Sequence, residues 1–254
     1  DINTRLENAP RVDGRCIVGV GFHAAALAPV TAARHRAFGR GLLGKALLRQ
    51  KTYAEAVGLD LRDKRHWFPW FVAAALFAKP IRAEVARNTA SLLFREGITT
   101  PEAIQKQGWD KLVTILDRGG YVRYDFSTAT KLLAIASALP GARLQQIVAE
   151  MSSPHIQTRL MEIKGVGPKT VEIFLRELRG VAKIRLPLSR EAREAARRLK
   201  LRLEGIDLRG MDFARLESVL VRIWVEHCKR RLWSTCPAGP ACGCAPRRDE
   251  RFLR

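Results

Sequence analysis

The chain has 254 residues, and its 45 Lys and Arg against 25 Asp and Glu give a formal net charge of +20. This excess favours a polyanion partner, because each cation placed on a phosphate releases condensed counterions, although charge alone also suits RNA or an anionic membrane. The longest apolar run, 67–78, is too short to cross a bilayer, and no convincing export signal is present, so we expect a cytoplasmic protein outside the membrane.

Helical periodicity dominates the chain, and the alternation typical of strands is scarce. Thr100 precedes a proline and starts one helix with a cap, and Ser127 or Thr128 is expected to cap another. Only 13–22 is a candidate strand. We predict an all-α fold with helices at 31–57, 67–78, 82–95, 101–106, 109–117, 127–138, 143–151, 156–163, 169–179, 189–199 and 212–229.

The segment 161–178 has the arrangement of two helices joined by a glycine hairpin. Gly165 and Gly167 suit a turn in which the backbone takes positive φ or lets another backbone approach, and Pro168 suits the first position of a helix. The hairpin amides and the positive helix end then point at one spot, which is a ready anion site. We expect phosphate contacts from Lys164, Gly165, Val166, Gly167 and Thr170. The alternative is an ordinary connection between two helices.

The second helix of this hairpin buries one face, because Val171, Phe174, Leu175 and Leu178 recur at helical spacing. Its other face carries Lys169, Glu172 and Arg176, and the last two are expected to form an i,i+4 ion pair.

Residues from about 67 to 244 resemble the endonuclease III type of helix-hairpin-helix DNA glycosylase, a superfamily of base-excision repair enzymes. The hairpin 164–170 is the specific match, and the segments 74–82, 119–129 and 233–244 follow the family's order at similar distances. The resemblance implies a monomer that binds damaged or abasic double-stranded DNA. It also implies two helical lobes flanking a DNA cleft, one formed by 60–173 and the other by 1–59 with 174–254.

The resemblance implies that Lys169 is a nucleophile that attacks the sugar C1′, forms a Schiff base and permits strand nicking. Such a lysine must be neutral to act. Pro187 stands where similar enzymes carry an aspartate that assists cleavage of an intact nucleoside bond. We expect Asp125 to supply a substitute carboxylate, with Glu191 as second choice; Asp125 is alternatively a helix-capping residue.

The segments 74–82 and 119–129, which also match the family, suggest DNA contacts near the lesion. Lys79 occupies the position of the family's wedge glutamine, so it is expected to contact phosphate or the orphaned base, with a helix-end lysine as the alternative. Arg82 follows in the same turn as a further DNA contact. Tyr121 and Tyr124 are expected to stack on a flipped base or, alternatively, to pack the loop.

The C-terminal cysteines differ in spacing from the family's iron-sulfur loop, and the final family cysteine is missing. Four thiols are what such a cluster or a zinc site needs. We expect no metal and no cofactor, with a degenerate, reduced loop; the residual candidates are Cys228, Cys236, Cys242 and Cys244.

The sequence therefore predicts a DNA glycosylase or abasic-site lyase. Because an abasic site already carries its aldehyde, the lyase activity is expected to outlast glycosylase activity when the aspartate is missing. The alternative is a protein of the same fold that binds damaged DNA with weak or no catalysis.

Overall fold

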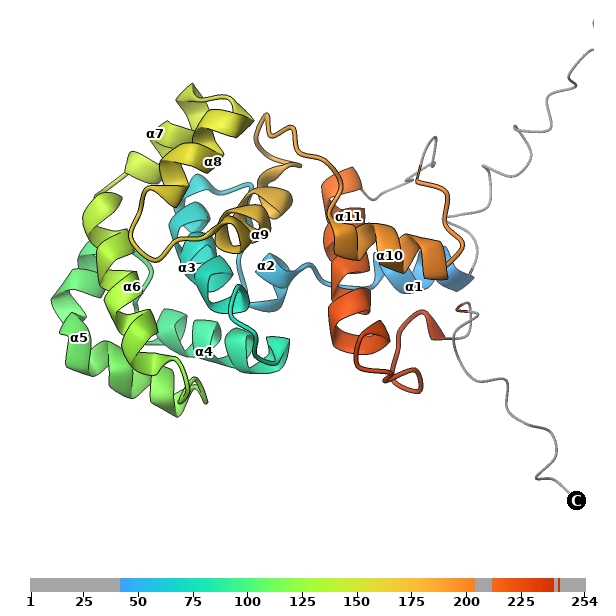
Figure 1. The fold of residues 1–254 in the computed structure, drawn as a ribbon, viewed down its shortest axis with the longest axis horizontal. Coiled ribbons are helices and arrows are strands. Elements are labelled where there is room, and N and C mark those ends of the chain that lie inside the picture. Colours follow the sequence, from blue (N-terminus) through green and yellow to red (C-terminus); the bar gives the residue numbers. More distant parts are fainter. Residues whose placement is uncertain (1–41, 204–211, 240–241, 243–254) are drawn as a thin grey trace, which may run out of the picture. The chain divides into compact units, whose positions relative to one another are not determined.

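The computed structural model describes residues 42–203, 212–239 and 242, and every regular element in these residues is a helix (Figure 1). All of them belong to one unit, residues 35–254. The predicted strand at 13–22 and the predicted helix before residue 42 lie outside the described residues. The elements are α1 (Leu42–Leu48), α2 (Tyr53–Ala56), the 3-10 helix η2 (Lys64–His66), α3 (Trp67–Phe77), α4 (Ala83–Arg95), α5 (Pro101–Arg118), α6 (Asp125–Ala138), α7 (Arg143–Glu150), α8 (Ser153–Met161), α9 (Pro168–Leu178), α10 (Arg190–Arg198), α11 (Phe213–Arg222) and the π-helix η3 (Ile223–Cys228).

Most predicted helices are confirmed to within a few residues, and the break predicted between 106 and 109 is present inside α5. Gly108 has φ 72° and ψ 175°, a backbone conformation that interrupts the helix there. The single helix predicted over 31–57 is wrong in its described part. Thr52 starts a new helix, since its hydroxyl accepts from the amide of Glu55 and its own amide donates back to the Glu55 carboxylate.

The predicted cap of α6 is also wrong. The helix begins at Asp125, two residues before Ser127. The Ser127 hydroxyl donates to the carbonyl of Tyr124 at 3.1 Å, and Thr128 is fully buried inside the helix. The Ser127 hydroxyl therefore bonds to a backbone carbonyl within the first turn and does not cap the helix.

Helix α3 is the centre of the core, because nearly all of its side chains are buried. It contacts both α4 and α9. The Trp70 indole donates to the carbonyl of Phe174 at 3.2 Å, and the Phe71 and Phe174 rings meet edge to face with centroids 4.9 Å apart. This packing fixes α9, the helix that carries Lys169, against the core.

Among the described residues no single helix has both the length and the apolar character needed to cross a membrane; only α6 and α7, bent by 69° at their junction, pass that test as a pair.

Candidate functional site

The turn between α8 and α9 has the geometry that its glycines and proline predict. Gly165 has φ +81°, in the left-handed region that favours glycine. Gly167 is the N-cap of α9 and Pro168 its first residue. A Cβ on Gly165 would lie 3.2 Å from Lys131 Cγ, whereas a Cβ on Gly167 would meet nothing within 4 Å. The backbone conformation and the nearby Lys131 side chain therefore favour glycine at position 165. The α-carbon of Gly167, in contrast, faces open space at the start of α9.

Four backbone amides of this turn have no acceptor among the residues that the structure describes, namely those of Lys164, Gly165, Gly167 and Lys169. Two residues that were expected to contact phosphate, Val166 and Thr170, are instead buried. Val166 is buried and its amide donates to the Ile163 carbonyl at 2.9 Å. Its N–H and side chain are therefore already engaged.

Thr170 is likewise turned inward. Its side chain is buried, its amide donates to the carbonyl of Gly167, and its hydroxyl accepts from Lys131 Nζ at 3.2 Å. The expectation of a phosphate contact from Thr170 is corrected: the hydroxyl satisfies a buried lysine. Lys164 is exposed, as a phosphate contact requires.

Lys131, on α6, was missed by the sequence analysis. Only 7% of it is exposed, and burial, followed by the nearby charge of Lys79, lowers the pKa of its amine to about 8. The one available signal was a lysine inside the apolar stripe of 129–136. Its ammonium lies at the first turn of α9 and adds positive charge beneath the hairpin.

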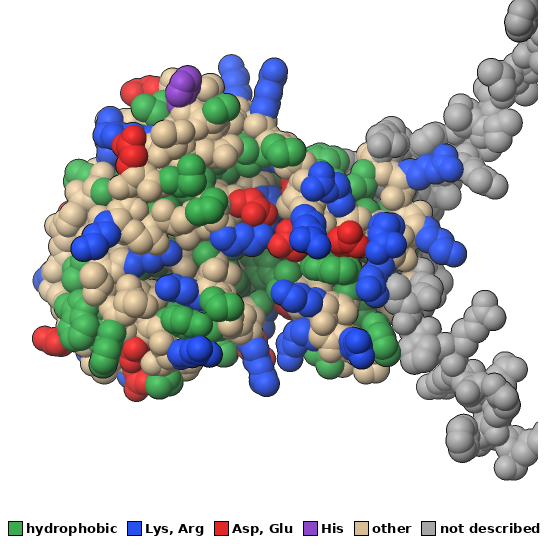
Figure 2. Space-filling view, viewed as in Figure 1, with side chains coloured by type: hydrophobic (Ala, Val, Ile, Leu, Met, Phe, Trp, Pro, Cys, Tyr) green, Lys and Arg blue, Asp and Glu red, His purple; other side chains and the backbone are tan. Residues whose placement is uncertain are grey.

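Lys169 is exposed at the start of α9 and contacts two carboxylates. Its Nζ lies 2.8 Å from Glu191 Oε1 and 3.1 Å from Glu172 Oε2. Glu172 also pairs with Arg176 at 3.9 Å, which confirms the predicted i,i+4 ion pair. Figure 2 shows Asp and Glu side chains gathered among Lys and Arg beside a hollow on the displayed face. The amine thus has proton acceptors within hydrogen-bond distance.

Glu191 stands in the first turn of α10, four residues after Pro187. Burial alone would raise its pKa, but the hydrogen bond from Lys169 and the charges of Lys169 and Arg176 lower the pKa below its ordinary range. Pro187 is exposed and its carbonyl accepts from Arg179. A carboxylate therefore reaches Lys169 from α10, the helix that follows Pro187.

Asp125 does not reach Lys169, which corrects the first choice made from the sequence. Its carboxylate accepts from the amide of Phe126 at 2.7 Å, and no hydrogen bond or ion pair joins it to Lys169 in the described part of the chain. Local hydrogen bonding at the start of a helix is an ordinary role for aspartate.

Lys169 and Glu191 stand at a small cavity of about 70 Å³. That volume is far below the roughly 300–1,000 Å³ typical of ligand pockets. The remaining wall is apolar except for one guanidinium. The lining residues are Tyr53, Phe77, Ile81, Ala83, Ala86, Lys169, Ile173, Arg176, Glu191, Val221 and Val225.

Arg176 is buried, although the sequence placed it on the outer face of α9. Only 2% of the residue is exposed. Buried arginines normally have hydrogen-bonded partners, yet Nε of Arg176 has none among the described residues. Helical spacing alone did not reveal this burial, because it arises from packing against elements distant in the sequence; α9 contacts α3 and α11.

The aromatic loop at the start of α6 has one buried and one half-buried tyrosine. Tyr121 is 1% exposed and donates to the carbonyl of Leu76 at 2.6 Å, while burial raises the pKa of its hydroxyl. Tyr121 therefore packs the loop, which was the alternative prediction. In this conformation its buried ring cannot stack on a base. Tyr124 is half-buried, with Lys79 Nζ 5.1 Å from its ring centroid.

Arg82 is exposed at the N-cap of α4 and borders a groove of about 750 Å³. Arg87, Lys229 and Arg230 line the same groove together with Glu84 and Glu226, so its cations outnumber its carboxylates. The groove and the small cavity share Ile81, Ala83 and Val225, so the two adjoin.

The cysteines occupy the C-terminal segment. Cys228 and Cys236 are buried, Cys242 is half-buried, and Cys244 lies outside the described residues. No three possible His, Cys, Asp or Glu ligands come together within the described ranges.

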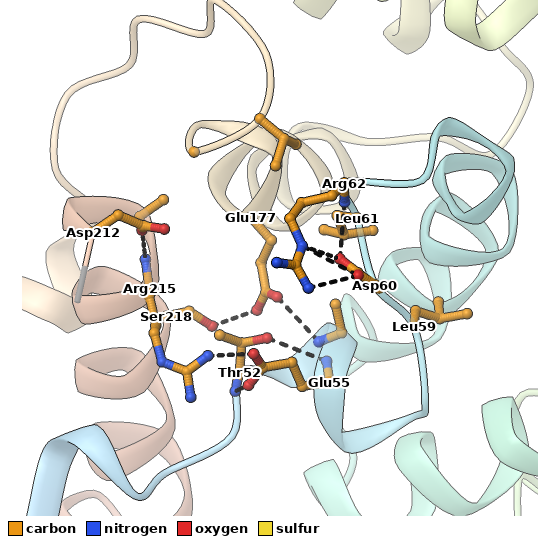
Figure 3. A pocket seen from close by; sticks show the side chains of 14 residues that line it. Thr52, Glu55, Leu59, Asp60, Leu61, Arg62, Glu177, Asp212, Arg215 and Ser218 are labelled. Carbon is orange, nitrogen blue, oxygen red and sulfur yellow. Dashed lines mark hydrogen bonds and ion pairs between the residues drawn. The ribbon is translucent and has the colours of Figure 1, made fainter. Parts of the chain in front are cut away.

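A larger pocket of about 370 Å³ lies between α2, α9 and α11 (Figure 3). Its carboxylates are engaged within the protein: Glu177 accepts from the amides of Tyr53 and Ala54, and Asp60 binds Arg62. Glu55 pairs with Arg215. These polar groups hold the fold together.

A scan of protein-family models, a search of curated proteins and a search of solved structures each found no match to this chain.

Proposed function

We propose that this chain is a DNA-binding base-excision repair protein that acts as an abasic-site lyase through a Schiff base on Lys169. The observation that carries the proposal is the position of that amine. It lies on the first turn of α9 beside amides without acceptors, touches Glu191, and borders a cavity.

In this proposal α8, the turn and α9 form a helix-hairpin-helix that grips one DNA phosphate. The unsatisfied amides and the positive end of α9 favour an anion, and the bare α-carbon of Gly167 lets a phosphate approach closely. The exposed Lys164 and the buried Lys131 add charge. The basic groove that carries Arg82 offers a second stretch of backbone contact.

The cavity draws residues from both proposed lobes, 60–173 and 1–59 with 174–254, which supports a cleft between them. Phe77, Ile81 and Lys169 come from the first, and Tyr53 and Glu191 from the second. A nucleotide swung out of the duplex would enter such a cleft.

Chemistry then requires that Lys169 lose a proton, and Glu191 at 2.8 Å is the acceptor. The neutral amine attacks C1′ of the open sugar, and water leaves to give the Schiff base. Removal of a C2′ proton then expels the 3′ phosphate and breaks the strand. Because the cavity is far smaller than a base pocket, an abasic sugar is the favoured substrate.

The second candidate is a protein of the same fold that binds damaged DNA without chemistry. Pro187 favours it, since proline cannot offset positive charge on the sugar as the family's aspartate does. Glu191 opposes it, because a carboxylate does stand beside the amine.

Borohydride reduction tests the proposal. The protein is incubated with duplex DNA that carries one abasic site, and reduction is expected to trap a covalent adduct that peptide mapping assigns to Lys169. An undamaged duplex is the control and should give no adduct. Binding of the abasic duplex without an adduct would establish the second candidate, and the absence of any binding would reject both.

Gly167→Ala separates the proposed grip from the fold. Because the φ of Gly167 is −107° and the added methyl group meets nothing within 4 Å, stability should change little. The methyl group should nevertheless obstruct the phosphate, so we expect at least about tenfold weaker DNA binding, or roughly 1.4 kcal/mol. Fluorescence anisotropy and thermal unfolding measure the two effects. Unchanged affinity would place the phosphate elsewhere.

Gly165→Ala is the matched control at the same hairpin. Its φ of +81° makes alanine unfavourable by about 1–2 kcal/mol, and its Cβ presses on Lys131. This variant should lose stability as well as affinity.

A further inference from the structure

Arg176 is a buried guanidinium at the wall of the Lys169 cavity. It lines that cavity together with Ile173 and Glu191, and 2% of the residue is exposed. Arginine stays protonated in proteins and has five N–H donors. A largely buried charged donor group therefore lines the same cavity as the proposed reacting amine.

The donors of Arg176 are poorly satisfied. Its closest carboxylate, Glu172, is 3.9 Å from Nη1, beyond hydrogen-bond distance. Its Nε is wholly buried and has no hydrogen-bond acceptor among the described residues, and no hydrogen bond from Nη1 or Nη2 is found within them. A buried donor without an acceptor is costly to stability, so the placement of this guanidinium beside a cavity points to an acceptor that arrives with the substrate.

Lys169 and Arg176 flank a common neighbour. Lys169 Nζ lies 3.2 Å from Glu172 Oε1, and Arg176 Nη1 lies 3.9 Å from the same oxygen. Lys169 and Arg176 also both line the small cavity, so a small polar group there can contact the amine at one end and the guanidinium at the other. A carbonyl group has this form, with an electrophilic carbon and an acceptor oxygen.

We propose that Arg176 is a catalytic residue that binds the C1′ oxygen of an open-chain abasic sugar and stabilises the oxyanion formed when Lys169 attacks. This inference rests on the proposed lyase function. It makes the aldehyde form of the abasic site the substrate, because only that form has an electrophilic carbonyl carbon whose oxygen becomes an oxyanion when the amine attacks.

The step balances without any additional reactant. Glu191 takes one proton from the Lys169 ammonium, and the free amine forms a bond to C1′ while the carbonyl π electrons move onto oxygen. Arg176 donates hydrogen bonds to that oxyanion. A second proton passes from the attached nitrogen to the oxygen and gives the carbinolamine. Glu191 returns its proton, water leaves, and a protonated Schiff base remains.

Arg176→Met tests the role, since methionine retains length and apolar contacts but has no donor. Loss of an oxyanion donor slows chemistry by roughly 100–1,000-fold. We expect that loss in the single-turnover rate of borohydride-trapped adduct at saturating DNA. Affinity for a duplex carrying a tetrahydrofuran abasic analogue, which has no aldehyde, should stay within about threefold of the wild type. Arg95→Met, at an exposed position on α4, is the control and should change neither quantity.

Arg176→Lys keeps the positive charge and provides a second test if Arg176→Met fails to fold. It should form adduct at an intermediate rate, because the charge remains but the planar fork is lost. If the wild type forms adduct and both Arg176 variants match its rate, the inference is overturned while the lyase function stands. A proportional loss of analogue binding and rate would assign Arg176 a structural role and also overturn it. No adduct from the wild type would reject the lyase function itself and the inference with it.

Discussion

Lys169→Met is expected to abolish the covalent adduct on abasic DNA and to slow strand nicking by at least about a thousandfold, because no other group can replace the lost amine. The side chain is 45% exposed and its ion pairs are with surface-accessible carboxylates, so folding should be little affected. Adduct formation in single-turnover trapping, nicking on gels and thermal unfolding measure the three quantities.

Two variants give this experiment its controls. Lys164→Met removes a cation from the same hairpin and should weaken DNA binding while leaving the adduct intact at saturating DNA. Glu191→Gln keeps the amine but removes the carboxylate nearest to it, so the adduct should form more slowly. If the Lys169→Met protein still forms an adduct, the nucleophile must be another lysine. The buried Lys131 would then be the first to test.

The helices could be predicted largely because their signals are local. Apolar spacing located α3, α4 and α9, and the Gly165 and Pro168 positions followed from backbone geometry that each residue type favours. The failed helix over 31–57 shows the limit of this approach. Its apolar pattern is continuous, but the hydroxyl of Thr52 captures an amide and starts a separate helix.

The site depends on contacts across long separations, and these could not be deduced from spacing. Glu191 lies 22 residues after Lys169 in the chain, yet its carboxylate accepts a hydrogen bond from the Lys169 amine at 2.8 Å. Arg176 is buried on α9, which packs against α3 and α11, although its place in the sequence is typical of a solvated helix face. Asp125 was favoured because it lies in a loop that resembles the family, yet a neighbouring amide engages it.

Burial also decided between alternatives that residue type left open. Tyr121 and Tyr124 are three residues apart in one loop, and only the fold shows that the first is buried against α3 while the second stays half-exposed. Thr170 follows Lys169 directly, but a residue one position along a helix points about 100° away. Its hydroxyl therefore faces the core and Lys131.

Glu177→Ala is expected to lower the free energy of unfolding by about 3–5 kcal/mol, one of the largest losses available to a single substitution in this chain. The Glu177 carboxylate is buried and accepts from the amides of Tyr53 and Ala54 at 3.1 and 3.0 Å (Figure 3). It also accepts from the hydroxyl of Ser218. Alanine would leave two amides at the start of α2 and the Ser218 hydroxyl on α11 without their acceptor.

The measurement is the urea midpoint at constant m-value, with Glu150→Ala as control, since Glu150 is exposed and should shift stability by less than about 0.5 kcal/mol. Glu177→Gln should fall between the two, because an amide oxygen can still accept some of these bonds. An unchanged midpoint in Glu177→Ala would mean that water satisfies the three donors. Tyr53 lines the Lys169 cavity, so loss of this anchor should slow adduct formation even at temperatures where the variant remains folded.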